Sequence, residues 1–293
     1  MASAAQWVEG ARPRTLPAAV SPVLAGSGVA VHSESFIWWK ALLALVVALA
    51  LQVGVNYAND YSDGVRGTDE GRVGPLRLVA SGTASPPRVK AAAVAAFGVA
   101  AAAGAVLSLT TAWWLLLVGA AAIVAGWYYT GGRHPYGYRG FGEVGVFVFF
   151  GLVAVAGTAY VQVEALTSGV GWVACGVGVI AVAILVANNL RDIPTDEASG
   201  KRTLAVVIGD HSSRRLFTGL HAAGYVFAVA ASVQVSAWLL LSMTALPLSL
   251  RAAGTVRQGA TGTGLVAVLR DTGLTELVYA TGLLAGYVVA SAG

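Results

Sequence analysis

The chain has 293 residues, of which 57% are hydrophobic and 11% are charged, with a formal net charge of +4 and a single cysteine. A soluble domain carries about 25% charged residues, so a soluble enzyme, a disordered chain and a disulfide-stabilised scaffold are excluded. The composition predicts an all-α integral membrane protein, surrounded by lipid and without a nucleic-acid partner.

Continuous apolar runs of helical length follow one another along the chain. A bilayer core requires about 20 mostly apolar residues per helix, and the strands of a membrane barrel would instead alternate over about 10 residues. The sequence therefore predicts about nine transmembrane helices in a single domain over residues 1–293. The predicted segments are 16–32, 36–58, 89–110, 112–130, 142–162, 167–189, 215–233, 235–250 and 275–292. The stretch 251–273, rich in Gly and Thr, is predicted to be a loop.

The distribution of positive charge predicts how these helices are oriented. With nine alternating helices, all Lys and Arg residues except Lys40 fall on the side of the amino terminus. The positive-inside rule places that side in the cytoplasm of a bacterial-type cell, hence in its plasma membrane, with the carboxyl terminus outside. Six Trp residues fall on the opposite side, as expected for an interfacial aromatic belt. They are Trp38, Trp39, Trp113, Trp114, Trp172 and Trp238.

Acidic residues gather in two stretches, at about 56–88 and 188–214, at the predicted cytoplasmic ends of the second and sixth helices. The first holds Asn59 and Asp63, the second holds Asp192 and Asp196, and both pairs are four residues apart. On a helix this spacing places both side chains on one face. Because the two helices run parallel, both sets face the same side of the membrane, like the halves of an internal duplication.

Two facing sets of carboxylates predict a site for a hard divalent cation. Mg²⁺ takes oxygen ligands and commonly bridges one or two carboxylates to substrate phosphates. Nearby cations could bind the remaining phosphate oxygens of a diphosphate. They are Arg66, Arg72, Lys201 and Arg202. The alternative is that these acids are solvated loop charges paired with the same cations, which explains one Asp more readily than two clusters at equivalent helix ends.

Several short motifs, in this order along the chain, resemble the UbiA-type intramembrane prenyltransferases. The first metal motif of that family is commonly Asn-x3-Asp-x3-Asp, whereas Asn59-x3-Asp63-x5-Asp69 is two residues longer here. That longer form is similar to the branch that prenylates 1,4-dihydroxy-2-naphthoate in menaquinone biosynthesis. The motifs are ARPRTLP at 11–17, NDYSDGVRGTD at 59–69, VGPLRL at 73–78, YTGGRHPYGYRGFGE at 129–143, NNLRDIPTD at 188–196, GKRTL at 200–204 and RDTGL at 270–274.

The resemblance implies a Mg²⁺ cofactor, with polyprenyl diphosphate and 1,4-dihydroxy-2-naphthoate as substrates. The matching metal ligands are Asn59, Asp63 and Asp69 in the first motif and Asp192 and Asp196 in the second. The aspartates Asp63, Asp192 and Asp196 are also expected to be catalytic, together with Asp60 beside the first motif. The helices would surround a central cavity open to the cytoplasmic side and laterally to lipid, where the isoprenoid tail would lie.

Further residues are expected around the substrates. The family often has Tyr-x3-Lys after the fourth helix, and Tyr129-x3-Arg133 stands in its place. Arg can bind a diphosphate but does not accept a proton, so a binding role fits and a base role does not. Candidates for the carboxylate of the aromatic acceptor are Arg14, Asn189 and Arg191. Rings that could stabilise an allylic cation, or could simply pack, are Tyr57, Tyr61, Tyr128, Phe147, Phe149, Phe150 and Tyr160.

Other functions remain open at this point. The acceptor could be a different aromatic compound. Asp60-x2-Asp63-Gly64 resembles the opening of the CDP-alcohol phosphotransferase motif, although Gly67-Thr68-Asp69 does not continue it and the second cluster is unexplained. A secondary transporter could use Asn and Asp for a coupling ion, although transporter sites lie near the membrane midplane. The oligomeric state is not indicated by the sequence.

Overall fold

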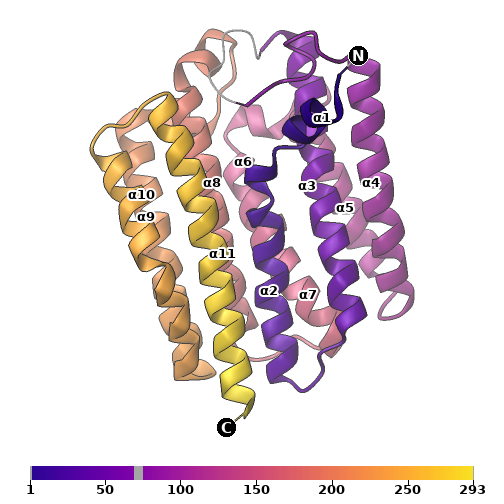
Figure 1. Cartoon of the computed structure of the whole chain (residues 1–293), viewed down its shortest axis with the longest axis vertical. Helices are drawn as coiled ribbons and strands as arrows, with labels where there is room; N and C mark the ends of the chain where they lie inside the picture. Colours follow the sequence, from indigo (N-terminus) through magenta and orange to yellow (C-terminus); the bar gives the residue numbers. More distant parts are fainter. Residues whose placement is uncertain (1, 69–74, 293) are drawn as a thin grey trace.

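The computed structural model describes residues 2–68 and 75–292, which form an elongated bundle of helices (Figure 1). The amino-terminal half contains α1 (Ala4–Gly10), η1 (Pro13–Thr15), α2 (Pro17–His32), α3 (Trp38–Arg66), α4 (Pro86–Leu109) and α5 (Leu115–Tyr128). Next come η2 (Tyr136–Arg139), α6 (Gly142–Val146), the π-helical η3 (Phe147–Val153) and α7 (Ala154–Val163). The remaining elements are α8 (Val170–Ala198), α9 (Leu204–Gln234), η4 (Ala237–Ala245), α10 (Leu246–Arg257) and α11 (Thr263–Ala292).

The structure confirms the all-helical membrane fold, and each predicted segment contains a helix. Within the described residues, seven spans are long and apolar enough to cross a membrane, or eight if the bent pair Ala4–Thr15 and Pro17–His32 counts as one. The apolar helix α5 is shorter, so the count of nine stays a prediction. The loop prediction for 251–273 is wrong: α10 extends to Arg257 and α11 begins at Thr263, because a Gly- and Thr-rich sequence can be helical when its neighbours pack against it.

Helix α8 lies at the centre of the bundle and is the most buried of the candidate spans. It packs against α9, α11, α2 and the α6–α7 segment. Small residues allow these close contacts, as expected where lipid rather than water surrounds the helices. At the crossing with η3, a Cβ on Gly151 would lie 2.6 Å from the Cα of Gly178 and 3.0 Å from the carbonyl oxygen of Ala174.

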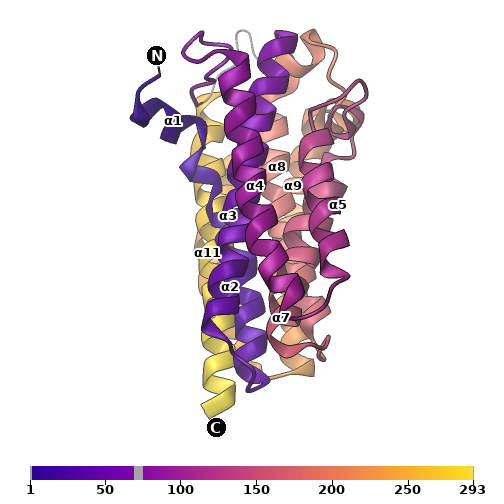
Figure 2. The ribbon, with the colours of Figure 1, turned by 90° about the vertical axis from the view of Figure 1, so that its right-hand side faces the viewer.

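The two long helices that carry the acidic residues extend beyond the predicted apolar segments. α3 continues through Asp63 to Arg66, and α8 continues through Asp196 to Ala198, so both predicted ligand pairs, Asn59–Asp63 and Asp192–Asp196, lie on helices rather than in loops. Gly67, with φ of 72°, ends α3 in the left-handed conformation that glycine adopts without strain. Figure 2 shows α1 and the last turns of α3 at the same end of the bundle, opposite the carboxyl terminus.

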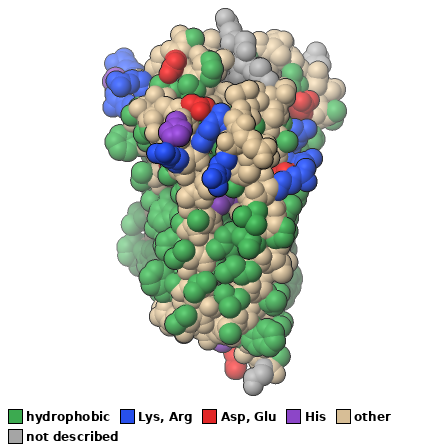
Figure 3. Space-filling view, turned by 90° about the vertical axis from the view of Figure 1, so that its left-hand side faces the viewer, with side chains coloured by type: hydrophobic (Ala, Val, Ile, Leu, Met, Phe, Trp, Pro, Cys, Tyr) green, Lys and Arg blue, Asp and Glu red, His purple; other side chains and the backbone are tan. Residues whose placement is uncertain are grey.

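The surface has the pattern of a membrane-embedded bundle. On the face seen in Figure 3, hydrophobic side chains cover most of the length, and charged side chains gather near one end. Exposed Trp residues are found towards the other end, among them Trp38, Trp113 and Trp238. The acidic helix ends and the Trp residues therefore lie at opposite ends, as the sequence predicts.

We expect Gly151→Val to destabilise the fold. The added side chain meets backbone atoms of α8, which cannot rotate away, and overpacking of this kind costs about 1–3 kcal/mol. The measurement is thermal unfolding of purified protein in detergent. Gly98→Ala in α4 is the matched control, because no atom lies within 4 Å of its added Cβ and Ala favours the helix. Equal unfolding temperatures for the two variants would contradict this packing analysis.

Candidate active site

A cavity of about 1040 Å³ runs through the bundle. It is lined by residues of α2 to α8, including η3, and by the first turns of α11, while α1 and η1 contribute at its polar end. Apolar and small side chains line most of its length. The polar end contains four of the predicted ligands, Asn59, Asp63, Asp192 and Asp196. The cavity therefore joins a site for charged groups to a long apolar groove.

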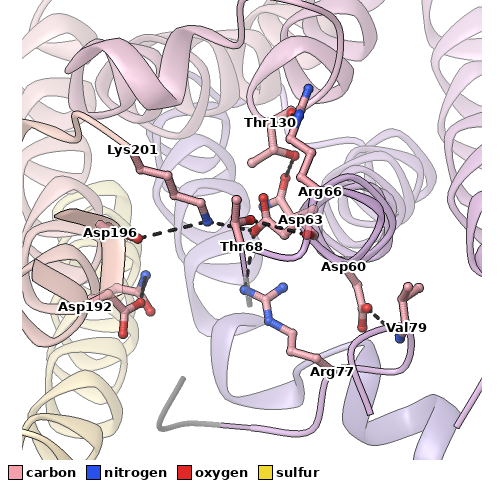
Figure 4. Close-up of polar contacts among 12 residues, drawn as sticks. Asp60, Asp63, Arg66, Thr68, Arg77, Val79, Thr130, Asp192, Asp196 and Lys201 are labelled. Carbon is pink, nitrogen blue, oxygen red and sulfur yellow. Dashed lines mark hydrogen bonds and ion pairs between the residues drawn. The ribbon is translucent and has the colours of Figure 1, made fainter. Parts of the chain in front are cut away.

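Asp63 is the centre of the polar end, and its carboxylate contacts three side chains from three different segments. Figure 4 shows two of them, Lys201 and Arg77. The Tyr138 hydroxyl donates a hydrogen bond to Oδ1 at 2.5 Å. The Lys201 ammonium lies 3.4 Å from Oδ2, and the Arg77 guanidinium lies 3.7 Å from the same oxygen. Asp63 is 3% exposed, so these partners offset the loss of hydration that burial imposes on a carboxylate.

The second pair faces the first across the cavity. Lys201 Nζ lies 4.0 Å from Asp196 Oδ1 while it contacts Asp63, so one ammonium stands between the two acidic helices. Asp192 is paired with its neighbour Arg191 through two hydrogen bonds of 2.7 and 2.9 Å. Each carboxylate of the site thus has a cationic partner. If a metal ion bound the carboxylates, these Lys and Arg side chains would be able to bind an anionic ligand instead.

Asn59 and Asp60 are adjacent in sequence and have different surroundings. Asn59 lines the cavity, and its Oδ1 accepts a hydrogen bond of 2.8 Å from the hydroxyl of Thr130. Asp60 does not line the cavity and accepts hydrogen bonds from the backbone N–H groups of Leu78 (2.7 Å) and Val79 (3.0 Å). Asp60 therefore holds the backbone at Leu78 and Val79 and, contrary to the prediction of a catalytic role, does not face the cavity.

Two tyrosines at the polar end remain protonated donors at neutral pH. Burial, followed by the negative charge of Asp63, raises the pKa of the Tyr138 phenol. Burial also raises the pKa of Tyr129, which the charge of Glu143 raises further. Because both phenols keep their protons, they can donate hydrogen bonds to oxygen atoms in the cavity, and neither can act as a general base.

The donors at the polar end fit a hard cation shared with a substrate. All are oxygen atoms of carboxylates or amides, the ligands that Mg²⁺ takes. Within residues 2–68 and 75–292, no three acidic, His or Cys side chains are grouped as a closed metal site. The described carboxylates are suited to an ion that bridges one or two of them to phosphate oxygens.

Comparison with known proteins identifies the family. The UbiA prenyltransferase family matches residues 19–291. The chain belongs to that family. Among its relatives, the 1,4-dihydroxy-2-naphthoate octaprenyltransferase of Mycobacterium tuberculosis is 55% identical over 284 residues, which are 96% of each chain. The enzyme of the same name from Escherichia coli is 35% identical over 223 residues, covering 71% of this chain and 70% of the relative.

Solved structures of UbiA proteins show the same fold. A UbiA homologue from Archaeoglobus fulgidus, bound to GPP and Mg²⁺, superposes with a TM-score of 0.70 at 13% identity and covers 98% of this chain and 100% of its own. An apo UbiA homologue from Aeropyrum pernix gives a TM-score of 0.71 at 16% identity, over 90% of this chain and 96% of its own. The UbiA family covers nearly the whole chain, including both acidic motifs, so the alternative of a CDP-alcohol phosphotransferase is excluded.

Some predicted site residues of this UbiA prenyltransferase do line the cavity, and others do not. Beyond the four metal-ligand candidates, it is lined by Lys201, Tyr129, Arg14, Asn189 and Arg191. Arg66 is turned towards the backbone carbonyls of Thr130 and Gly132, and Arg133 and Arg202 are exposed. Asp69 and Arg72 lie outside the described residues.

The proposed ring set needs correction. Phe149 and Phe150 line the cavity, but the other five rings do not. Tyr57 contacts Trp7, Tyr61 contacts Trp127, Tyr160 contacts Trp114, Phe147 packs against Gly178, and Tyr128 is 51% exposed. The positions of these rings in the sequence indicate how far along the bundle they lie. They do not indicate the direction in which each side chain points.

Three residues that sequence reasoning did not select contact the metal-ligand candidates. Arg77 and Tyr138 contact Asp63, and Thr130 contacts Asn59. Two signals were present: Arg77 lies in the VGPLRL motif, and Tyr138 in the motif at 129–143. Arg77 comes from a loop and Tyr138 from the short helix η2, and they lie 14 and 75 positions from Asp63 in the sequence, so helical periodicity could not reveal either contact.

We expect Asp63→Ala and Asp192→Ala each to reduce turnover by at least about 100-fold. Loss of either carboxylate would remove a ligand of the predicted Mg²⁺, whose charge would stabilise the leaving diphosphate. The activation free energy should rise by several kcal/mol. The measurement is diphosphate release by protein whose thermal unfolding and elution in gel filtration match the wild type. Glu197→Ala, an exposed acid next to Asp196, is the control and should keep its activity. Near-normal rates in both Asp variants would contradict the site assignment.

Proposed function

We propose that this protein transfers a polyprenyl group from polyprenyl diphosphate to the ring of 1,4-dihydroxy-2-naphthoate, with loss of the carboxylate as CO₂ and with Mg²⁺ as cofactor. The observation behind the proposal is the pair of facing carboxylate clusters at the polar end of a long apolar cavity. The choice of acceptor is supported by the named relatives, one of them 55% identical over 96% of the chain. We assign the reaction to one transmembrane domain over residues 1–293.

The polar end is suited to the departure of diphosphate. Asn59, Asp63, Asp192 and Asp196 are the residues that would hold Mg²⁺, which would supply positive charge to the diphosphate oxygens. Lys201 and Arg77 lie against Asp63, where they can donate hydrogen bonds to diphosphate oxygens that do not bind the metal. Tyr138 and Tyr129 keep their protons and can also donate to the leaving group. The diphosphate leaves with the bonding electron pair, and the allylic cation remains in the apolar part.

The acceptor ring supplies the new bond. Its electron-rich carbon attacks the allylic carbon, and the electrons of the bond to the carboxylate return to the ring as CO₂ leaves, so that the product is a demethylmenaquinol. Arg14 and Asn189 line the cavity and are the candidates that bind the acceptor. Arg191 is held by Asp192 in a bidentate pair and is better placed to orient that carboxylate.

The apolar groove is suited to the isoprenoid tail. It runs between α5 on one side and η3 and α7 on the other, where Phe149 and Phe150 face the cavity. No residue of α5 is fully buried, because one face borders the cavity and the other lies on the outside of the bundle. We propose that a tail longer than the groove continues between α5 and α7 into the lipid, which explains why the reaction takes place in a membrane.

We propose the plasma membrane as the location, with the polar end of the cavity and the amino terminus in the cytoplasm. The positive residues at that end support this orientation, and the carboxyl terminus at the opposite end would then lie outside. The position of the acids at one end of the bundle also disfavours a transporter, whose ion site would lie near the midplane.

Purified protein in detergent should convert 1,4-dihydroxy-2-naphthoate and a polyprenyl diphosphate into diphosphate, CO₂ and a lipid-soluble quinol in equal amounts. Removal of Mg²⁺ with EDTA should stop all three products, and added Mg²⁺ should restore them, because the carboxylates alone repel a diphosphate. Products are followed by phosphate assay, labelled CO₂ and chromatography. Turnover with other aromatic acids but not with this naphthoate would overturn the choice of acceptor, while no turnover with any acceptor would overturn prenyl transfer.

We expect Gly119→Phe to shift the preference towards short donors. Gly119 lines the groove on α5, and no atom lies within 4 Å of an added Cβ, so a larger side chain there would extend into the space of the groove. Displacing two methylenes of a long tail, at about 0.8 kcal/mol each, lowers kcat/KM for octaprenyl diphosphate by roughly tenfold. Geranyl diphosphate should be little affected. Gly119→Ala is the control, and equal losses with both donors would contradict the tail assignment.

A further inference from the structure

Glu143 is a buried acid that the proposed reaction leaves without a role. It lies in the first turn of α6 and is 7% exposed, and its side chain does not line the cavity. Its Oε1 accepts a hydrogen bond of 2.9 Å from Nδ2 of Asn189, which comes from α8 and does line the cavity. One buried carboxylate therefore stands directly behind a side chain that faces the substrates.

This contact fixes which end of the Asn189 amide the substrates meet. A carboxylate oxygen accepts hydrogen bonds, so the NH₂ group of the amide must turn towards Glu143. The carbonyl oxygen Oδ1 is then left on the side of the cavity, and no described residue donates a hydrogen bond to it. Without Glu143 the two ends of the amide would be interchangeable.

The position of Asn189 along α8 matches the place where the acceptor ring must lie. Asn189, Asp192 and Asp196 are spaced i, i+3 and i+7, so they share one face of the helix. Three residues of helix correspond to about 4.5 Å, which places Asn189 nearly one turn deeper than the diphosphate end. The allylic carbon and the ring that attacks it must lie just below the diphosphate, at this depth.

We propose that Glu143 is a positioning residue, which holds the Asn189 amide so that its oxygen accepts a hydrogen bond from a hydroxyl of the aromatic acceptor. This hydrogen bond polarises the hydroxyl group and so increases the electron density on the ring. It also selects aromatic substrates that carry a hydroxyl beside the reacting carbon. The inference rests on the proposed function and refines its acceptor site. Glu143 itself does not touch the substrates, so it acts through Asn189.

A double-mutant cycle tests whether the two residues act as a unit. Asn189→Ala removes the oxygen and Glu143→Leu releases the amide, and each should raise the KM for the naphthoate by about tenfold, the effect of one hydrogen bond. The double variant should also be about tenfold worse than wild type, rather than hundredfold. The KM for polyprenyl diphosphate and the Mg²⁺ requirement should not change. Multiplied effects in the double variant would overturn the proposal.

A reversed pair gives a second test in variants of nearly unchanged shape. Asn189→Asp places two carboxylates against each other and should weaken acceptor binding. Adding Glu143→Gln to it restores a donor and an acceptor with their directions exchanged, and an oxygen still faces the cavity. Acceptor KM should then return to within about threefold of wild type. An acceptor KM that does not recover would overturn the proposal. The reversed pair provides the test if Glu143→Leu does not fold.

Two further comparisons separate the explanations. Glu276→Gln alters another buried acid, which lies in α11 away from the cavity, and should leave acceptor KM unchanged. An equal increase in acceptor KM for Glu276→Gln would mean that the loss of any buried acid disturbs the protein in this way. That result would overturn a positioning role for Glu143. If the wild-type protein does not turn over the naphthoate at all, the proposed function fails; if it does and the reversed pair shows no recovery, only the inference about Glu143 fails.

Discussion

The site depends on holding several carboxylates close together where little water can reach them. Asp63, Asp192 and Asp196 come from two helices and are each less than 10% exposed. Burial of an unpaired carboxylate costs several kcal/mol, so each requires a partner of opposite charge. Lys201 supplies the contact across the cavity, because it reaches both Asp63 and Asp196. If a divalent ion bound the carboxylates, the same cations could contact phosphate oxygens instead.

This constraint explains why the acids are on helices. A carboxylate in a mobile loop would pair with the nearest cation and lose its place, whereas α3 and α8 hold Asp63 and Asp192 in fixed register with the apolar spans below them. The close packing of α8 on η3 through Gly151 and Gly178 fixes the second helix. These two glycines therefore allow α8, which carries Asp192 and Asp196, to lie close against η3.

The sequence predicted the parts of the site that follow helical periodicity. The pairs Asn59–Asp63 and Asp192–Asp196 share faces because their spacing is four residues, and the structure brings both to one cavity. Residues in loops were harder: Lys201 was selected because it follows the second motif closely, but Arg77 and Tyr138 approach Asp63 only through the folded loops. Aromatic residues were the least predictable, since a ring near the right depth can point to the cavity, a neighbour or lipid.

The neighbours Asp60 and Asp63 show how one motif can serve two purposes. The two carboxylates are only three residues apart on α3, yet they have different partners. Asp63 faces the cavity, while Asp60 accepts hydrogen bonds from Leu78 and Val79 and thereby fixes the loop that brings Arg77 to Asp63. A loss of activity on replacing Asp60 would therefore follow from displacement of Arg77, whereas a loss on replacing Asp63 would follow from the change in the cavity itself.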